Sequence, residues 1–216
     1  MPIQTPLDPA GIVRANTVLQ SPPLCPEIEL RLLKQDAPLQ QASAGRLFDE
    51  DGPRPYWAFC WGSGQAVARY LLDNAHLVRK RRVLDFGSGS AVAAIAAAKA
   101  GAAEVRAADI DPVALAAIEI NAAHNRVSVS PCHQDTVETD DRDWDVLLGC
   151  DVCYLGSNCA WLRSLDRREG LILIGDPGRP GLPLDKLEEL ARFSVRTVPD
   201  LEHADLKEAA VYKFST

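Results

Sequence analysis

The chain has 216 residues, of which 47% are hydrophobic and 25% are charged. These shares are ordinary for a folded globular protein and exclude a disordered chain, a collagen-like repeat and a coiled coil. The formal net charge of -7 is unfavourable for a surface that binds nucleic acid or anionic membranes. No apolar run reaches the roughly 18 to 20 residues that span a bilayer, and the first residues lack the pattern of a secretory or transit signal. We therefore expect neither nucleic acid nor membrane as a partner, and a cytoplasmic location.

The first part of the chain, residues 1–55, is rich in Pro and Gln and carries a short strand pattern at Thr17–Leu19. We interpret it as an N-terminal arm that lies on a core formed by residues 56–216. Helical spacing of apolar residues begins in the segment Gly62–Asp73. Ser63 is a residue type that caps helix starts, so we expect it to cap this helix.

The rest of the core alternates short apolar strands with helices. The predicted strands are Arg82–Phe86, Glu104–Asp109, Arg126–Pro131, Trp144–Asp151, Leu171–Gly175, Phe193–Pro199 and Ala209–Phe214. The predicted helices are Ser90–Ala100, Val113–Asn125 (opened by Asp111-Pro112), Asn158–Arg168 and Leu184–Arg192. Strands that are apolar throughout and alternate with helices indicate a parallel sheet covered on both faces. The sequence therefore predicts an α/β fold whose mostly parallel, seven-stranded sheet ends in an antiparallel edge pair.

The segment after the first core strand, Leu84-Asp-Phe-Gly-Ser-Gly-Ser-Ala91, is typical of a ligand-binding turn. Its two glycines let the main chain bend sharply and lie close to a ligand, and the following helix offers free N–H groups. A dinucleotide motif needs a small residue three positions after Gly89, where this chain has Val92. Asp85 is unfavourable next to a pyrophosphate, but it suits a ligand that carries an ammonium or a sulfonium.

Two more carboxylates follow the next strands. Asp109 ends the second core strand at about the twenty-residue spacing at which a carboxylate reaches ribose hydroxyls. Asp135 follows the third strand, where we expect it to accept from an adenine amino group. Each carboxylate taken singly is also typical of a turn or a cap. Three of them at successive strand ends indicate one ligand, and S-adenosylmethionine carries every group that they would bind.

These residues also carry a resemblance to a known family. The glycine turn and Asp109 resemble the class I, Rossmann-like S-adenosylmethionine-dependent methyltransferases, whose seven-stranded sheet has a reversed last strand. Three further stretches are similar to the electron transfer flavoprotein β-subunit lysine methyltransferases, and the similarity runs from about Thr17 to the C-terminus. These stretches are Pro55-Tyr-Trp-Ala-Phe-Cys-Trp-Gly-Ser-Gly-Gln-Ala66, Asp151-Val-Cys-Tyr154 and Leu173-Ile-Gly-Asp-Pro-Gly-Arg-Pro180. The resemblance implies a protein-lysine N-methyltransferase that acts on the electron transfer flavoprotein β subunit.

The resemblance also implies a role for individual residues. Those expected to line the cofactor pocket or hold the cofactor are Trp61, Gly62, Asp85, Gly87, Gly89 and Asp109. Asp151 and Tyr154 are expected to face the target lysine, with Asp151 binding its ammonium and stabilising the charge that grows on nitrogen. Tyr154 would pack on the cation or hydrogen-bond the amine. Ala91 stands where the family has glycine, so its methyl group either tightens packing or crowds the adenosine.

Several alternatives remain open at this point. Cys150 and Cys153 form a Cys-x-x-Cys pattern, which with Cys132-His133 would suit zinc or redox chemistry. Asp176 and Arg179 either shape the site or close a turn. Within enzymes, the alternative substrates are another protein, such as a ribosomal one, or a small amine. A non-catalytic S-adenosylmethionine-binding protein is the alternative from another class.

Overall fold

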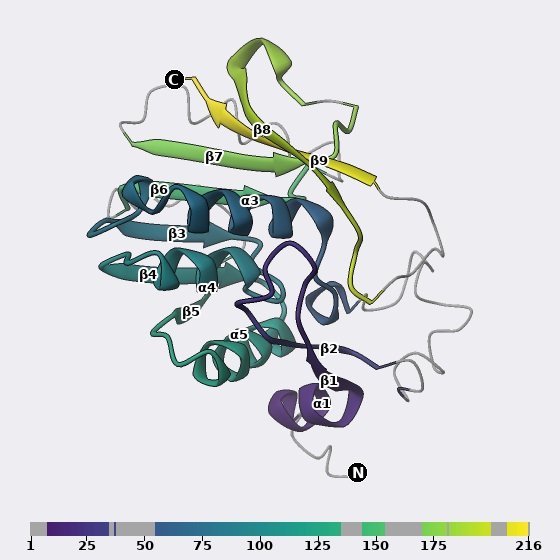
Figure 1. The fold of residues 1–216 in the computed structure, drawn as a ribbon. Helices are drawn as coiled ribbons and strands as arrows, with labels where there is room; N and C mark the ends of the chain where they lie inside the picture. The colour runs from purple at the N-terminus through teal and green to yellow at the C-terminus, as the bar shows by residue number, and fades with distance from the viewer. Residues whose placement is uncertain are drawn as a thin grey trace, which may run out of the picture.

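The computed structural model of the chain describes residues 8–34, 37, 55–134, 144–153, 170–180, 182–199 and 207–215. Its centre is a seven-stranded sheet in the order β5-β4-β3-β6-β7-β9-β8 (Figure 1). The strands are β3 (Arg82–Phe86), β4 (Glu104–Asp109), β5 (Ser130–His133), β6 (Val146–Cys150), β7 (Leu171–Asp176), β8 (Leu187–Val195) and β9 (Lys207–Phe214).

The sheet is parallel from β5 to β7 and becomes antiparallel at its far edge. β9 lies between β7 and β8 and runs opposite to both. The predicted Rossmann-like sheet with a reversed last strand and an antiparallel edge pair is therefore confirmed. Because β4, β3 and β6 are parallel neighbours, their carboxyl ends meet at one edge of the sheet, where ligand sites form in such folds.

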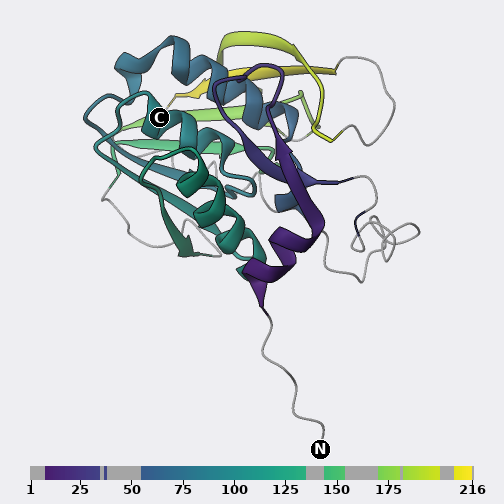
Figure 2. The same ribbon diagram turned by 60° about the horizontal axis from the view of Figure 1, so that its bottom comes forward.

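Three helices cover one face of the sheet: α3 (Gly62–Asp73), α4 (Val92–Lys99) and α5 (Pro112–His124) (Figures 1 and 2). They agree with the helices predicted for these segments. Asp111 caps α5 as predicted, because its side chain accepts from the Val113 N–H. The predicted cap at Ser63 is wrong, since Trp61 is the N-cap of α3 and no side chain caps it.

Small residues bring this helical layer close to the strands. α4 is alanine-rich and almost wholly buried, so it lies near the sheet. A Cβ added to Gly175 of β7 would lie 2.7 Å from the Ser63 carbonyl oxygen. α3 therefore packs directly over the carboxyl end of β7, and any larger residue at Gly175 would force the two elements apart.

The opposite face of the sheet is buried as well. Leu147, Ile172 and Ile174 point to this side and are at most 1% exposed. Within the ranges that the structure describes, no α-helix lies on this face. The predicted helix over Asn158–Arg168 lies outside the described residues.

The helix predicted over Leu184–Arg192 is wrong. This segment forms a single 3-10 turn, Leu184–Lys186, followed by β8, which pairs with β9 along its whole length. A bulge between Glu189 and Ala191 interrupts the alternation, so Leu187 packs on one face of the sheet and Ala191 on the other. The interrupted alternation mimics a helical period in the sequence, and pairing with β9 overrides the local preference.

The third core strand begins later than predicted. The sequence predicts it over Arg126–Pro131, whereas β5 begins at Ser130. Arg126 has a φ of 57°, and its N–H donates to the Ala123 carbonyl over 3.1 Å. This left-handed residue closes the end of α5, so the chain turns there before it can enter the sheet.

The arm consists of α1 (Pro9–Asn16), β1 (Thr17–Gln20) and β2 (Leu30–Leu33). β1 contains the predicted strand and pairs with β2 as a separate antiparallel hairpin. Both α1 and β2 lie against α5 (Figure 2). The boundary between arm and core at residue 55 stays a prediction. Among the described residues, no helix is long and apolar enough to cross a bilayer.

Candidate functional site

The turn between β3 and α4 bends through left-handed backbone. Gly87 and Gly89 have φ values of 67° and 52°, a region that glycine enters without strain. The Ser88 N–H donates to the Ala108 carbonyl over 3.0 Å, which ties the turn to β4. A Cβ at Gly89 would lie 3.7 Å from the Trp57 Cα, so the segment before α3 passes beside this turn.

Asp85 supports the turn from inside. Asp85 is buried, with 2% of its surface exposed. Its Oδ2 accepts from the Ser88 hydroxyl over 2.6 Å and from the Ala94 N–H over 3.2 Å. Burial raises the pKa of Asp85 to about 7, although Ser88 and Ala94 act against this shift. The carboxylate therefore links the turn to α4, and its predicted contact with a cofactor stays a prediction.

Asp109 lies at the end of β4, facing the same turn. Its Oδ2 accepts from the Gly89 N–H over 2.9 Å, and its Oδ1 accepts from the Asp111 N–H over 3.0 Å. Burial raises the pKa of Asp109, although the hydrogen bonds from these N–H groups act to lower it. The carboxylate is half-buried, and each oxygen has a second lone pair for a ligand hydroxyl.

Ile110, the residue after Asp109, was missed by the sequence analysis. It is 57% exposed and directly follows the strand-end carboxylate. It offers an apolar surface next to an acceptor for hydroxyl groups. In the sequence, the one indication that Ile110 lies at the candidate site was its position directly after Asp109.

Trp61 and Gly62 lie at the start of α3. The Trp61 indole N–H donates to the Tyr56 carbonyl over 3.0 Å, and its ring lies 5.5 Å from that of Phe59 between centroids. A Cβ at Gly62 would lie 2.7 Å from Cγ1 of Val195, so glycine permits the approach of β8. The predicted role of Trp61 and Gly62 in a cofactor pocket stays a prediction.

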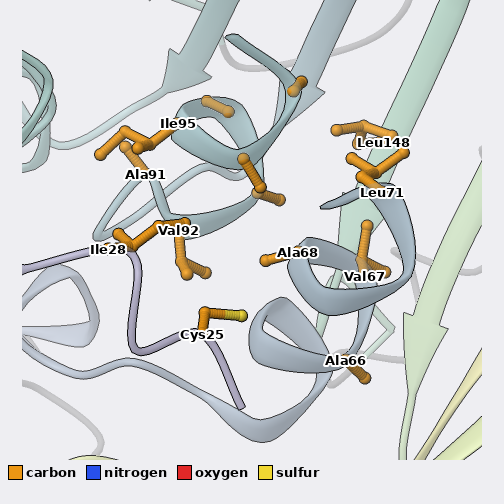
Figure 3. Packing of buried hydrophobic residues seen from close by; sticks show 14 of the residues in the cluster. Cys25, Ile28, Ala66, Val67, Ala68, Leu71, Ala91, Val92, Ile95 and Leu148 are labelled. Carbon is orange, nitrogen blue, oxygen red and sulfur yellow. The ribbon is translucent and has the colours of Figure 1, made fainter. Parts of the chain in front are cut away.

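Ala91 caps α4 in the left-handed region, with a φ of 67°. Its side chain is fully buried, in the cluster that contains Ile28 and Ile95 (Figure 3). The methyl group therefore packs between the arm and the helical layer. This packing agrees with the first of the two readings of Ala91.

Asp151 follows β6 and is the third carboxylate of interest at this edge, after Asp85 and Asp109. It has a φ of 58°, and its N–H donates to the Gly175 carbonyl over 3.0 Å. A Cβ at Gly87 would lie 3.1 Å from Cγ1 of Val152, so the chain beyond β6 lies against the glycine turn. The candidate cofactor turn and Asp151 thus share the carboxyl edge of adjacent strands.

Arg179 connects Asp151 to Asp176. One guanidinium nitrogen, Nη1, lies 2.6 Å from Oδ1 of Asp151 and 3.2 Å from Oδ2 of Asp176. The other oxygen of Asp176, Oδ1, accepts from the N–H groups of Gly178 and Arg179 over 2.8 and 2.7 Å. The sequence left open whether Asp176 and Arg179 shape the site or close a turn. They close the turn after β7, and Arg179 also binds Asp151.

The two oxygens of Asp151 have different surroundings. Oδ2 is buried, and within the described ranges no donor has hydrogen-bond geometry to it. Burial raises the pKa of Asp151, while Arg179 and then Ser63 of α3 act against the shift. A buried carboxylate oxygen without a donor is unfavourable, so Oδ2 keeps an unused capacity to accept a hydrogen bond.

Asp135 and Tyr154 both lie outside the described residues, so their predicted roles stay predictions. Cys150 and Cys153 do not form a disulfide, and burial raises the pKa of Cys150 well above its ordinary value. In the described part of the chain, no three His, Cys, Asp or Glu side chains gather as a metal site would need. The geometry there does not support the zinc alternative.

Comparisons with known proteins point to methyltransferases. Residues 65–149 match the family model described as ribosomal protein L11 methyltransferase (PrmA). The chain is 36% identical to an electron transfer flavoprotein beta subunit lysine methyltransferase of Xenopus laevis, over 95% of this chain and 87% of that protein. It is also 36% identical to the protein of that name in Homo sapiens, over 96% of this chain and 83% of the other.

A solved structure has a similar fold. A 16S rRNA N2 methyltransferase of T. thermophilus, in complex with AdoMet and guanosine, matches with a TM-score of 0.57 at 14% identity. The match covers 93% of this chain and 50% of that one. At this identity the likeness concerns the fold of the sheet and its helices.

Proposed function

Because this chain belongs to the family of electron transfer flavoprotein β-subunit lysine methyltransferases, we propose that it methylates lysine side chains of an electron transfer flavoprotein β subunit. It is an S-adenosylmethionine-dependent protein-lysine N-methyltransferase. The observation that carries the proposal is the pairing of two features at one edge of the sheet. The glycine turn with Asp109 provides a cofactor site, and Asp151 provides an acidic acceptor beside it.

The residues of the turn fit S-adenosylmethionine. Gly87 and Gly89 keep the main chain bare where the cofactor would lie, and Asp109 has lone pairs for the ribose hydroxyls. Ile110 offers its exposed side chain to the adenine ring. Asp85 places a titratable carboxylate beneath the turn, near the cationic end of the ligand. When bound, S-adenosylmethionine supplies a methyl group on a sulfonium, which is activated toward attack by a neutral amine.

Asp151 prepares the lysine for this attack. A free lysine has a pKa of about 10.4, so it arrives as an ammonium and must lose a proton before its nitrogen can react. Oδ2 of Asp151 accepts from the ammonium and aims it, and the proton leaves to water. The same carboxylate then stabilises the positive charge that grows on nitrogen. Tyr154 lies outside the described residues, and the family resemblance assigns it the role of packing against that cation or hydrogen-bonding the amine.

The test of this proposal is the Asp151→Asn variant. It keeps the shape of the side chain but removes the charge that holds the ammonium. We expect methylation of the flavoprotein β subunit, read by mass spectrometry, to fall by at least about a hundredfold. Cofactor affinity measured by calorimetry stays the same, because Asp151 lies on the acceptor side. Tyr154→Phe loses less activity, because packing survives and a hydroxyl is removed.

Asp145→Asn is the matched control. Asp145 lies just before the other end of β6 and pairs with Arg82, and its side chain is 42% exposed, so its variant should methylate normally. Near-normal activity of the Asp151 variant would contradict the proposed role of Asp151. Labelling a cell extract with a methyl-labelled cofactor addresses the substrate. A labelled ribosomal protein in place of the flavoprotein subunit would favour the first alternative, and no label would favour a non-catalytic protein.

A further inference from the structure

The acceptor side of the site is asymmetric at Asp151. Oδ1 is held by the Arg179 guanidinium over 2.6 Å, whereas Oδ2 has no donor in hydrogen-bond geometry among the described residues. The Ser63 hydroxyl also lowers the pKa of this carboxylate, but its effect is smaller than that of Arg179. The side chain of Asp151 is 15% exposed, so water solvates the carboxylate poorly. The asymmetry therefore comes from the protein, and it leaves Oδ2 as the oxygen with unused acceptor capacity.

The guanidinium is itself fixed in place. Arg179 lies 3.2 Å from Oδ2 of Asp176, whose side chain is 1% exposed. The other oxygen of Asp176 accepts two main-chain N–H groups of the same turn, those of Gly178 and Arg179. Asp176 cannot rotate without losing these bonds, so it holds the arginine against Asp151. A planar guanidinium that is anchored in this way orients the carboxylate that it binds.

We propose that Arg179 is a positioning residue for the methyl transfer: it binds Oδ1 of Asp151, keeps the carboxylate ionised and directs Oδ2 toward the incoming lysine. This inference rests on the proposed function. Arg179 does not touch the lysine and acts through Asp151. The lysine ammonium then supplies the donor that Oδ2 lacks, and the arginine does not have to leave.

The charge on Arg179 matters because Asp151 is buried. Burial raises the pKa of Asp151, and Arg179 acts against that shift. A neutral Asp151 would bind an ammonium poorly. Without the arginine, Asp151 should take up a proton at a higher pH, so methylation should be lost at low pH first. The titratable or polar groups that face Asp151 from neighbouring elements are Arg179, Asp176, Ser63 and Cys60, and Cys150 precedes it at the end of β6.

The other facing groups do not replace the arginine. Asp176 carries the same charge as Asp151 and raises its pKa. Burial raises the pKa of the Cys60 and Cys150 thiols well above their ordinary values, so both stay neutral near pH 7. Ser63 offers a hydroxyl and no charge. Within the described residues, Arg179 is the facing group that carries a positive charge.

The experiment compares Arg179→Gln and Arg179→Lys with the unaltered enzyme. In Arg179→Gln we expect the acid limb of the kcat/KM profile to move up by about one pH unit or more. Activity should recover at alkaline pH, where Asp151 ionises. Arg179→Lys keeps the charge but not the planar fork, so its acid limb should stay near the original position while kcat falls. If the Gln variant does not fold, the Lys variant still tests the proposal, because a shifted acid limb there would contradict it.

Arg192→Gln is the matched control. Arg192 also pairs with two carboxylates, those of Glu189 and Glu208, but it lies exposed on β8. Its loss should leave the pH profile unchanged. An unmoved acid limb in Arg179→Gln with a uniform fall in kcat would reduce Arg179 to a structural role. A lower KM for the protein substrate would mean that the arginine competes with the lysine, which overturns the proposal.

A second measurement does not depend on activity. Carboxyl-carbon NMR of aspartate-labelled protein, with the Asp151 signal assigned from Asp151→Asn, follows the ionisation of Asp151 directly. We expect its pKa to be higher by about one unit or more in Arg179→Gln than in the original protein. If this shift is present but the flavoprotein subunit is not methylated, the proposed function fails while the effect of Arg179 stands. If the pKa does not move, the role of Arg179 is wrong whatever the substrate.

Discussion

The side-chain amide of Asn121 donates to the main-chain carbonyl of Ser90 over 3.0 Å. Asn121 is fully buried in α5, and Ser90 is the residue after the second glycine of the cofactor turn. The amide oxygen of Asn121 accepts from the Arg31 N–H of β2 over 2.8 Å. One side chain therefore joins the N-terminal arm to the turn that we assign to the cofactor.

We expect Asn121→Ala to reduce stability by about 2 kcal/mol or more, because it leaves a donor and an acceptor without partners. It should also weaken S-adenosylmethionine binding, since the Ser90 carbonyl loses its anchor. Thermal unfolding and calorimetry measure the two effects. Asn125→Ala is the control: Asn125 bonds to Glu29 of the arm but does not contact the turn, so its cofactor affinity should be normal. Normal affinity in both variants would show that the arm does not support the turn.

Asp109→Ala should weaken S-adenosylmethionine binding by about 1 to 3 kcal/mol, because the ribose hydroxyls lose a charged acceptor. NAD should not bind to the unaltered protein, since Val92 and Asp85 disfavour a dinucleotide. Calorimetry with each ligand provides the measurement, and thermal unfolding checks that the variant is folded. NAD binding, or full affinity in the variant, would contradict the assignment of the pocket.

Ala91→Gly should leave cofactor affinity unchanged, because the methyl group packs against the arm and helices (Figure 3). Glycine would relieve about 1 to 2 kcal/mol of left-handed strain at a φ of 67°. It would also lose about 1 kcal/mol from the buried methyl group, so the free energy of unfolding should change little. Tighter binding of the cofactor in this variant would show that the methyl group does crowd the adenosine.

The buried Asp85 predicts a pH dependence of stability. Its pKa of about 7 in the folded state exceeds the unfolded value of about 3.9, so the folded state binds an extra proton between these values. The free energy of unfolding therefore falls as pH rises from about 4 to 7, by at most about 4 kcal/mol for this group. Above pH 7 this contribution no longer changes. Asp85→Asn should flatten this slope, measured as the melting temperature at pH 5 to 8.

Asp145→Asn is the control for that measurement. Arg82 holds the pKa of Asp145 below its ordinary value, so this group titrates outside the range from pH 5 to 8. Its removal should leave the slope in that range unchanged. An unaltered slope in Asp85→Asn would mean that Asp85 stays ionised throughout.

The features that depend on neighbours in the chain were visible in the sequence. The glycine turn requires left-handed backbone at Gly87 and Gly89, and few other residues supply it. The capping of α5 by Asp111 follows from residues that adjoin its start. The parallel order of the strands follows from apolar runs that alternate with helices. These features rest on local geometry and hydrophobic pattern, which a sequence carries directly.

Other features depend on which distant segments meet. β8 is a strand because β9 offers it a hydrogen-bonding edge, although its own residues favour a helix. Ala91 is buried in the same hydrophobic cluster as Ile28 of the arm (Figure 3), which local pattern does not reveal. Arg179 reaches Asp151 across the ends of two strands, and burial then makes its charge important for the carboxylate. Burial and long-range pairing are properties of the packed molecule, so these relationships became visible after the chain was folded.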